Sequence, residues 1–305
     1  MTGVLVANAP VSYGAFELTV GIDDNVPDGG EVLDQVAAAG YAGIDLGPPG
    51  YLGTGTALAG RLARRGLGLA GGYLELPFSE PEGMAAAIHG LDVLLDVFDS
   101  ARLPPAMFSP RPTFADAGSE ARRARPGQAA HDRSLGFDAE AWKRFADGVE
   151  TAAGRCRERG YEPAFHHETG THIEAVWEIE KVLELTSVGL CLDTGHLLLG
   201  QGDPVQAMRD WASRINHLHL KDARRVVVEQ IVCEAAPVRE IWRRQAFCRL
   251  GAGDVDVDGV LDAVRAGYSG WLVVEQDVLP DPTQHAGKPA TDQVANRQYL
   301  RERGF

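Results

Sequence analysis

Positive charge is scarce in this 305-residue chain. It has 29 Lys and Arg against 43 Asp and Glu, which gives a formal net charge of −14 at pH 7. Binding to nucleic acid or to an anionic membrane surface relies on clustered basic side chains. The composition therefore argues against both partners and favours a solvated acidic surface.

Cysteines and long apolar runs are also few. The cysteines, which show no Cys-x-x-Cys spacing, are Cys156, Cys191, Cys233 and Cys248. A chain of this size needs no disulfide staples, so reduced thiols are expected. No apolar stretch approaches the roughly 20 residues of a membrane helix, and the first nine residues lack the basic leader of a signal peptide. These features predict a cytoplasmic protein.

The chain does contain a regular alternation of apolar, β-branched segments with segments of helical spacing. Such alternation is typical of parallel strands joined by helices. Strands are expected at residues 3–9, 41–46, 67–73, 105–108, 162–167, 188–192, 215–220 and 271–275. They predict an α/β fold, a single (β/α)8 TIM barrel that forms one domain over residues 1–305. A doubly wound sheet fits less well, because no Gly-rich phosphate loop follows the first strand.

One stretch departs from this regularity. Residues 109–136 contain Pro, Gly and scattered Arg without clear periodicity. In a barrel this stretch follows the fourth strand on the active-site side, so we expect either a lid or a disordered insertion there.

Four of the expected strands end on residues that ligate hard metals, namely Glu168, Asp193, His219 and Glu275. The carboxyl ends of barrel strands open onto one face, where function concentrates. Three carboxylates and one imidazole suit an oxygen-preferring divalent cation better than a structural zinc site. The sequence therefore predicts one metal site, with Mn²⁺ as the first choice and Mg²⁺ or Co²⁺ as alternatives.

Further polar residues are expected around this ion. His196, three residues after Asp193, is expected to bind substrate hydroxyls or to donate a proton. Lys221 and Arg224 follow His219 and can neutralise an oxyanion. The remaining candidates for substrate contacts lie at strand ends or in loops, and they are Tyr13, Asp45, Glu75 and His166.

Several segments resemble the xylose-isomerase-like barrel superfamily of sugar isomerases, epimerases and dehydratases. The strongest are Leu-Asp193-Thr-Gly-His196 and His217-Leu-His219-Leu-Lys221-Asp. With Asn8-Ala-Pro-Val-Ser-Tyr-Gly and the Gly-Trp-Leu-Val-Val-Glu275 strand, the chain is most similar to the inosose dehydratases. The resemblance fails only around residues 109–136. It implies a small keto-polyol or keto-sugar substrate, and it leaves a homo-oligomer open.

One position departs from that pattern. Inosose dehydratases tend to carry His where this chain has Glu168, whereas the epimerase and isomerase branches carry Glu. In either case a metal that polarises a ketone acidifies the neighbouring carbon-bound proton, which a carboxylate can remove. Loss of water, assisted by His196, then gives a dehydratase. Reprotonation by the Glu168 and Glu275 pair gives an epimerase or isomerase, and elimination-type cleavage of a C-glycoside is a further alternative. A non-enzymatic sugar-binding barrel is disfavoured, because all four ligands are present.

Overall fold

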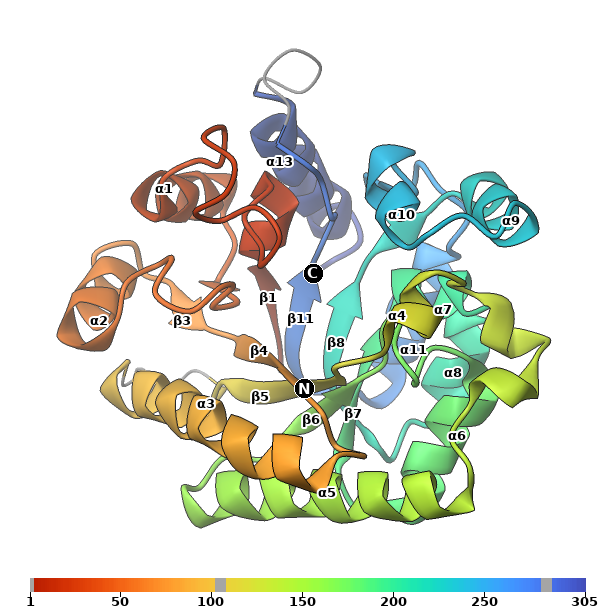
Figure 1. The fold of residues 1–305 in the computed structure, drawn as a ribbon. Coiled ribbons are helices and arrows are strands. Elements are labelled where there is room, and N and C mark those ends of the chain that lie inside the picture. The colour runs from red at the N-terminus through yellow and green to blue at the C-terminus, as the bar shows by residue number, and fades with distance from the viewer. Residues whose placement is uncertain (1–2, 102–107, 281–286) are drawn as a thin grey trace.

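The computed structural model of the protein describes residues 3–101, 108–280 and 287–305. Its main sheet is wholly parallel, with the strand order β3-β2-β1-β11-β8-β7-β6-β5-β4. The strands are β1 (Val4–Asn8), β2 (Gly43–Ile44), β3 (Gly68–Leu69), β4 (Gly71–Leu76), β5 (Arg111–Asp116), β6 (Ala164–His166), β7 (Gly189–Asp193), β8 (Ile215–Leu220) and β11 (Gly270–Val274). Figure 1 shows them arranged around a common centre with the helices outside.

The two outermost strands in that order, β3 and β4, are consecutive parts of one extended segment. Only Ala70 separates them; its N–H donates to Ile44 O over 2.9 Å, and its carbonyl accepts from Arg111 N over 3.0 Å. The nine strands therefore fill eight barrel positions, which confirms the predicted (β/α)8 TIM barrel.

Helices of the barrel follow the strands in chain order. They are α1 (Gly29–Ala39), α2 (Gly55–Ala63), α3 (Pro81–Ser100), α4 (Glu120–Arg123), α5 (Ala139–Glu158), α6 (Val176–Leu185), α7 (Thr194–Leu199), α8 (Pro204–Asp210), α9 (Arg225–Cys233), α10 (Arg239–Arg243), α11 (Val257–Gly267) and α13 (Lys288–Arg301). Their ends carry ordinary capping signals. Asp203, for example, caps α8 by accepting from Val205 N and Gln206 N at 2.9 and 3.1 Å. Among the helices of the described ranges, none has the length and apolar character to cross a membrane.

The position of the fourth strand in the sequence differs from the prediction. The segment expected there, residues 105–108, lies outside the described residues except for Phe108. Strand β5 occupies the fourth position instead, paired with β4 and β6, and it lies inside the stretch expected to be irregular. Its apolar run is short because Arg111 and Pro112 begin it and Asp116 ends it.

The rest of that stretch packs against α6. It contains α4 and two short 3-10 helices, η2 (Gln128–Ala130) and η3 (Arg133–Leu135). The Arg122 guanidinium is buried and donates to both carboxylate oxygens of Glu178, at 2.7 and 3.0 Å. Trp177 Nε1 donates to Ala129 O over 2.8 Å. The segment is thus tied to the barrel by a buried ion pair and an indole hydrogen bond.

A second small sheet follows β8. Strands β9 (Asp222–Ala223) and β10 (Phe247–Cys248) pair antiparallel, and α9 and α10 lie between them in the chain. Asp222 holds the following turn, because its carboxylate accepts from Gly251 N, Gly253 N and Val255 N. This excursion stands beside the carboxyl end of β8 (Figure 1).

Candidate active site

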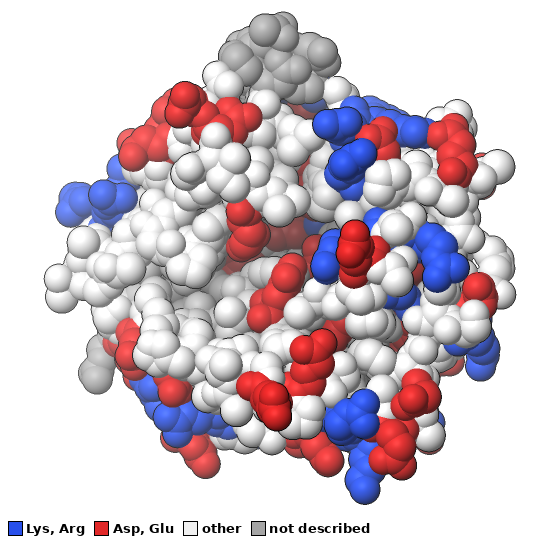
Figure 2. Space-filling model, in the orientation of Figure 1, with Lys and Arg blue, Asp and Glu red and all other residues white. Residues whose placement is uncertain are grey.

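A cavity of about 100 Å³ opens at the carboxyl ends of the barrel strands. In Figure 2 the molecule is hollowed near its centre, and acidic side chains stand around the hollow. Its polar lining residues are Glu17, Asp45, Tyr73, His166, Glu168, His196, His219, Lys221, Trp242, Glu275 and Asp277. The segment 117–136 contributes none of the described residues that line it.

Three of the four predicted metal ligands meet in this cavity. Ligand atoms of Asp193, His219 and Glu275 all lie within 4.8 Å of one another. His219 Nδ1 is 3.2 Å from Glu275 Oε2 and 3.8 Å from Asp193 Oδ2. Asp193 and His219 are paired in register on β7 and β8, and Glu275 follows the last residue of β11. Adjacent parallel strands therefore place the three side chains together.

The two oxygens of Asp193 have different surroundings. Oδ1 caps α7 by accepting from Gly195 N at 2.9 Å and His196 N at 2.8 Å. Oδ2 is buried and accepts no hydrogen bond from the described residues, and the same holds for both ring nitrogens of His219. Buried polar atoms are normally paired. The contacts of these atoms with Lys221, Glu275 and Asp45 are ion-pair contacts and not hydrogen bonds, and the set fits a divalent cation.

The ammonium of Lys221 is buried within the same cluster. Its Nζ lies 3.2 Å from Asp193 Oδ2, 3.1 Å from Glu275 Oε2 and 2.8 Å from Asp277 Oδ1. Burial opposes its charge, but the attraction of Asp193 and Asp277 prevails and holds the pKa of Lys221 well above its usual range. Burial likewise opposes the charge of Glu275, whose pKa is nevertheless lowered by His219 and Lys221.

The fourth predicted ligand, Glu168, stands at the wall of the cavity, apart from the other three. The Tyr73 hydroxyl donates a short hydrogen bond to its Oε2, and His166 Nδ1 lies 3.8 Å from the same oxygen. Burial, with a smaller contribution from the negative charge of Glu75, raises the pKa of Glu168 to about 8. Glu168 and Glu275 thus face one cavity with pKa values displaced in opposite directions.

Three of the predicted catalytic or substrate-contact residues, His196, His166 and Asp45, also line this cavity. His196 Nε2 lies 4.0 Å from Asp277 Oδ2, and its Nδ1 lies 3.4 Å from Thr169 N. His166 Nε2 is 3.5 Å from Asp193 Oδ2, and Asp45 Oδ2 is 3.5 Å from His219 Nε2. Burial lowers the pKa of both His166 and His196, so both imidazoles are neutral at pH 7.

Three other predicted substrate contacts lie beside the cavity and are not among its lining residues. Tyr13 is packed in the hydrophobic core. Glu75 is exposed, and its Oε1 lies 3.2 Å from the Tyr73 hydroxyl oxygen. Arg224 donates to Gln245 O over 2.7 Å and lines a neighbouring cavity.

Sequence reasoning missed Tyr73 and Asp277. Asp277 follows Glu275 by two residues, and that spacing was a usable signal because alternate residues of an extended segment face the same side. Tyr73 offered no such signal, because its partner Glu168 is 95 positions away in the chain.

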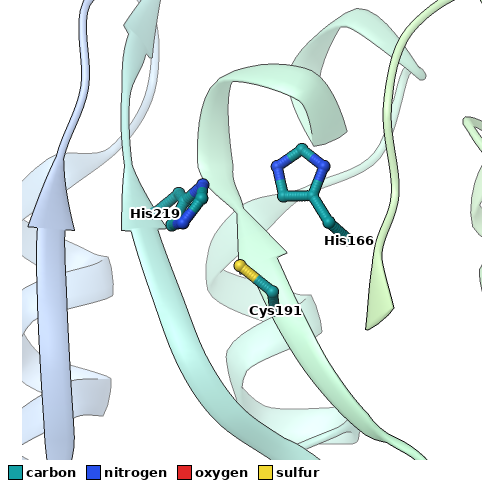
Figure 3. Close-up of side chains that lie close together, drawn as sticks. All are labelled: His166, Cys191 and His219. Atoms are coloured by element: carbon teal, nitrogen blue, oxygen red, sulfur yellow. The ribbon is translucent and has the colours of Figure 1, made fainter. Parts of the chain in front are cut away.

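A softer group of ligands lies next to the oxygen-rich one. His166, Cys191 and His219 bring two imidazoles and a thiol within 4.8 Å of one another. Figure 3 shows the three side chains converging, with His219 on β8 and Cys191 on β7. Asp45, His217 and His219 form another such group. Since all of these groups use His219, a cation bound by one competes with a cation bound by the others.

The chain belongs to the xylose isomerase-like TIM barrel family, whose model matches residues 33–302. Among curated proteins, an inosose dehydratase of Clostridium tetani (strain Massachusetts / E88) is 32% identical over 171 residues. That match covers 55% of this chain and 56% of the relative, so it spans only about half of each protein.

Solved structures share the fold over the whole chain. A D-allulose 3-epimerase from Methylomonas sp., in complex with D-allulose, superimposes with a TM-score of 0.67 at 11% identity and covers 100% of this chain and 98% of its own. The IOLI protein with a bound zinc atom gives a TM-score of 0.69 at 12% identity and covers 97% of both chains. At these identities the likeness concerns the fold alone.

Proposed function

We propose that this chain is a divalent-metal-dependent lyase that removes water from a keto-polyol, as an inosose dehydratase does. The observation that carries the proposal is the buried set of Asp193, His219 and Glu275, in which Asp193 Oδ2 and both ring nitrogens of His219 have no hydrogen-bond partner among the described residues. The relative of Clostridium tetani named inosose dehydratase supports the reaction class. The zinc atom of the IOLI protein supports a divalent metal in this fold, and we retain Mn²⁺ as the first choice for this oxygen-rich set.

When bound, the cation supplies Lewis acidity that polarises a ketone and acidifies the neighbouring carbon-bound proton. The side chains of the protein then stabilise the developing negative charge and transfer the protons. Lys221 holds a fixed positive charge beside Asp193 and Glu275, where it stabilises developing negative charge on a substrate oxygen.

His196 is suited to hold the leaving hydroxyl by a hydrogen bond while a neighbouring acid protonates it. Nδ1 lies 3.4 Å from Thr169 N and 2.9 Å from Thr169 Oγ1; in the tautomer in which Nδ1 accepts from both, the proton of the neutral ring is on Nε2. Nε2 faces Asp277 across the cavity at 4.0 Å. The burial of Asp277 raises its pKa to about 6, against the attraction of Lys221. A carboxyl with that pKa can itself supply the proton that the leaving hydroxyl takes up at neutral pH.

A second candidate, a keto-sugar epimerase or isomerase, is favoured by one observation. Glu168 has its pKa raised to about 8, while that of Glu275 is lowered. Two carboxyl groups with opposed pKa values are what an acid and base pair requires. Removal of a proton by one and return by the other to the opposite face of the substrate gives inversion without loss of water.

The mass of the product distinguishes the dehydratase from the epimerase or isomerase. The purified protein is loaded with Mn²⁺ and incubated with scyllo-inosose, and separately with simple ketoses, in deuterated water. A product lighter by one water supports the dehydratase; one of unchanged substrate composition, apart from solvent deuterium, supports the epimerase. His196→Ala should lower turnover of a dehydratase by roughly 10² or more while Mn²⁺ content stays the same. No turnover of any of these compounds by the Mn²⁺-loaded protein would refute both candidates.

A further inference from the structure

A larger cavity, of about 720 Å³, adjoins the one at the barrel centre. The two cavities share Trp242 and Asp277 as lining residues. The larger one is bordered by the excursion between β9 and β10 and by residues that follow β11, among them Arg224, Phe247 and Arg249. Nothing in the proposed dehydration uses this space.

Among the polar groups that border the larger cavity from the excursion, the guanidinium groups of Arg224 and Arg249 and the indole N–H of Trp242 can only donate hydrogen bonds. Arg224 has a backbone carbonyl as its partner, and neither Arg224 nor Arg249 forms an ion pair with a carboxylate within the described part of the chain. Trp242 Nε1 is buried and has no hydrogen-bond partner among the described residues. Guanidinium and indole N–H groups cannot accept hydrogen bonds. A ligand that satisfies them must bring acceptor atoms, and two guanidinium groups favour a negative charge.

The two cavities differ in charge. The barrel-centre cavity gathers Asp193, Glu275 and Asp277 around the single ammonium of Lys221. An anionic group entering it would meet those carboxylates. The larger cavity is also lined by two carboxylates, Asp277 and Asp292, but they are outnumbered there by four cationic side chains, Arg224, Arg243, Arg249 and Lys288. An anionic molecule that spans both is therefore oriented with its charge outward.

Phe247 lies where the cavities meet and gives this orientation a structural basis. Its ring centroid is 5.3 Å from that of His196 and 4.8 Å from Lys221 Nζ. The same side chain lines the larger cavity, and Trp242 lines both. The two rings thus stand between the donors of one cavity and the reactive groups of the other.

We propose that the natural substrate is a keto-polyol or keto-sugar that carries an anionic group, a carboxylate or a phosphate ester, bound in the larger cavity by Arg224, Arg249 and the Trp242 N–H. This inference rests on the proposed function, since it assigns the reacting carbons to the barrel centre. It names the class of substrate that the function leaves open.

The test compares three ketoses that share one skeleton: neutral D-fructose, D-fructose 6-phosphate and D-fructuronate. Specificity is measured as kcat/KM with the Mn²⁺-loaded protein, and binding is measured separately by quenching of tryptophan fluorescence. The variants are Arg224→Gln, Arg249→Gln and the double variant. Arg64→Gln, an exposed arginine just after α2, is the matched control.

We expect a charged ketose to exceed D-fructose in kcat/KM by about tenfold or more, the size of one charge-assisted hydrogen bond. In the double variant the kcat/KM of the charged ketose should fall to that of D-fructose, whereas Arg64→Gln should keep the wild-type ratio. Whether the anionic group is a phosphate or a carboxylate is decided by which charged ketose has the larger kcat/KM relative to D-fructose. Trp242→Phe, which keeps the ring and removes the N–H, should weaken binding of the same ketose.

Equal kcat/KM for charged and neutral ketoses would overturn the inference and leave the proposed function intact. If none of these three ketoses reacts, turnover of scyllo-inosose still decides the proposed function, and binding alone decides the anion site. Saturable quenching by a charged ketose that the double variant loses would still support the anion site. Quenching that is absent, or that survives in the double variant, would overturn it.

Discussion

Replacement of Asp193 separates the two tasks that its carboxylate performs. Oδ1 caps α7 through Gly195 N and His196 N, while Oδ2 faces His219 and Lys221. Asp193→Asn can keep the capping oxygen and removes the charge. Asp193→Ala removes both. The two variants therefore share the loss of the proposed metal ligand and differ in the helix cap.

The expected magnitudes follow from that geometry. Loss of the charged ligand should weaken Mn²⁺ binding by about 100-fold or more in both variants, since removal of even an outer partner of a metal ligand costs about 10- to 100-fold. Loss of the cap should lower the free energy of unfolding of Asp193→Ala by about 1 kcal/mol relative to Asp193→Asn in the presence of a chelator. At a Mn²⁺ concentration of about 100 times its Kd, the wild-type protein should gain about 2.7 kcal/mol, and neither variant should gain as much.

Calorimetric titration with Mn²⁺ and denaturation in guanidinium chloride, with and without chelator, measure both quantities. Asp203→Asn is the matched control, because Asp203 caps α8 in the same way and lies outside the cavity. It should bind Mn²⁺ as the wild-type protein does. Wild-type Mn²⁺ affinity in Asp193→Asn would refute the assignment of Asp193 as a ligand.

Two further predictions concern buried ionisable residues. The first is about Arg122, which lies away from the proposed metal ligands, and the second is about His167, which lies next to them. Arg122→Met should destabilise the fold by about 3–5 kcal/mol in denaturation experiments, because it leaves Glu178 and Glu174 buried without their cation. The double variant Arg122→Met with Glu178→Gln should recover part of the lost stability. Additive losses from the two substitutions would contradict this pairing. Burial lowers the pKa of His167 in the folded protein to about 3. As the pH falls below the unfolded pKa of about 6.5, only the unfolded state takes up a proton, so the free energy of unfolding decreases by about 1.4 kcal/mol for each pH unit. His167→Gln should reduce the slope of stability against pH between pH 6 and 5 by about one proton, and an unchanged slope would show that His167 is not buried in its neutral form.

The residues that end the barrel strands could be predicted from the sequence, and the structure brings Asp193, His219 and Glu275 together. An apolar run that stops on Asp193 or Glu275 marks both a buried strand and the face on which it opens. Because parallel neighbours pair in register, the juxtaposition of Asp193 with His219 follows from the topology. Strand β5 could not be found in this way, since Arg111 and Pro112 begin it and Asp116 ends it, which leaves no long apolar run.

Contacts between distant segments were beyond the sequence pattern. Glu168 ends its strand as expected, but its hydrogen bond to Tyr73 depends on how β4 faces β6 across the barrel. Arg224 follows the His219 strand closely, yet the turn into β9 and α9 carries it toward the neighbouring cavity. Side-chain direction past a strand end is set by the excursion that follows, and excursions have no periodicity to read.

Charge balance connects the resident lysine with the proposed cation. Lys221 contributes one positive charge and lies within 3.2 Å of carboxylate oxygens of Asp193, Glu275 and Asp277. Three buried carboxylates beside one ammonium leave an excess of two negative charges when all are ionised, and buried charge is costly unless it is paired. A monovalent cation leaves one of these charges unmatched, whereas a divalent cation matches both. Among these four side chains, the lysine therefore would not replace the proposed cation; it reduces their net charge to the value that one divalent ion neutralises.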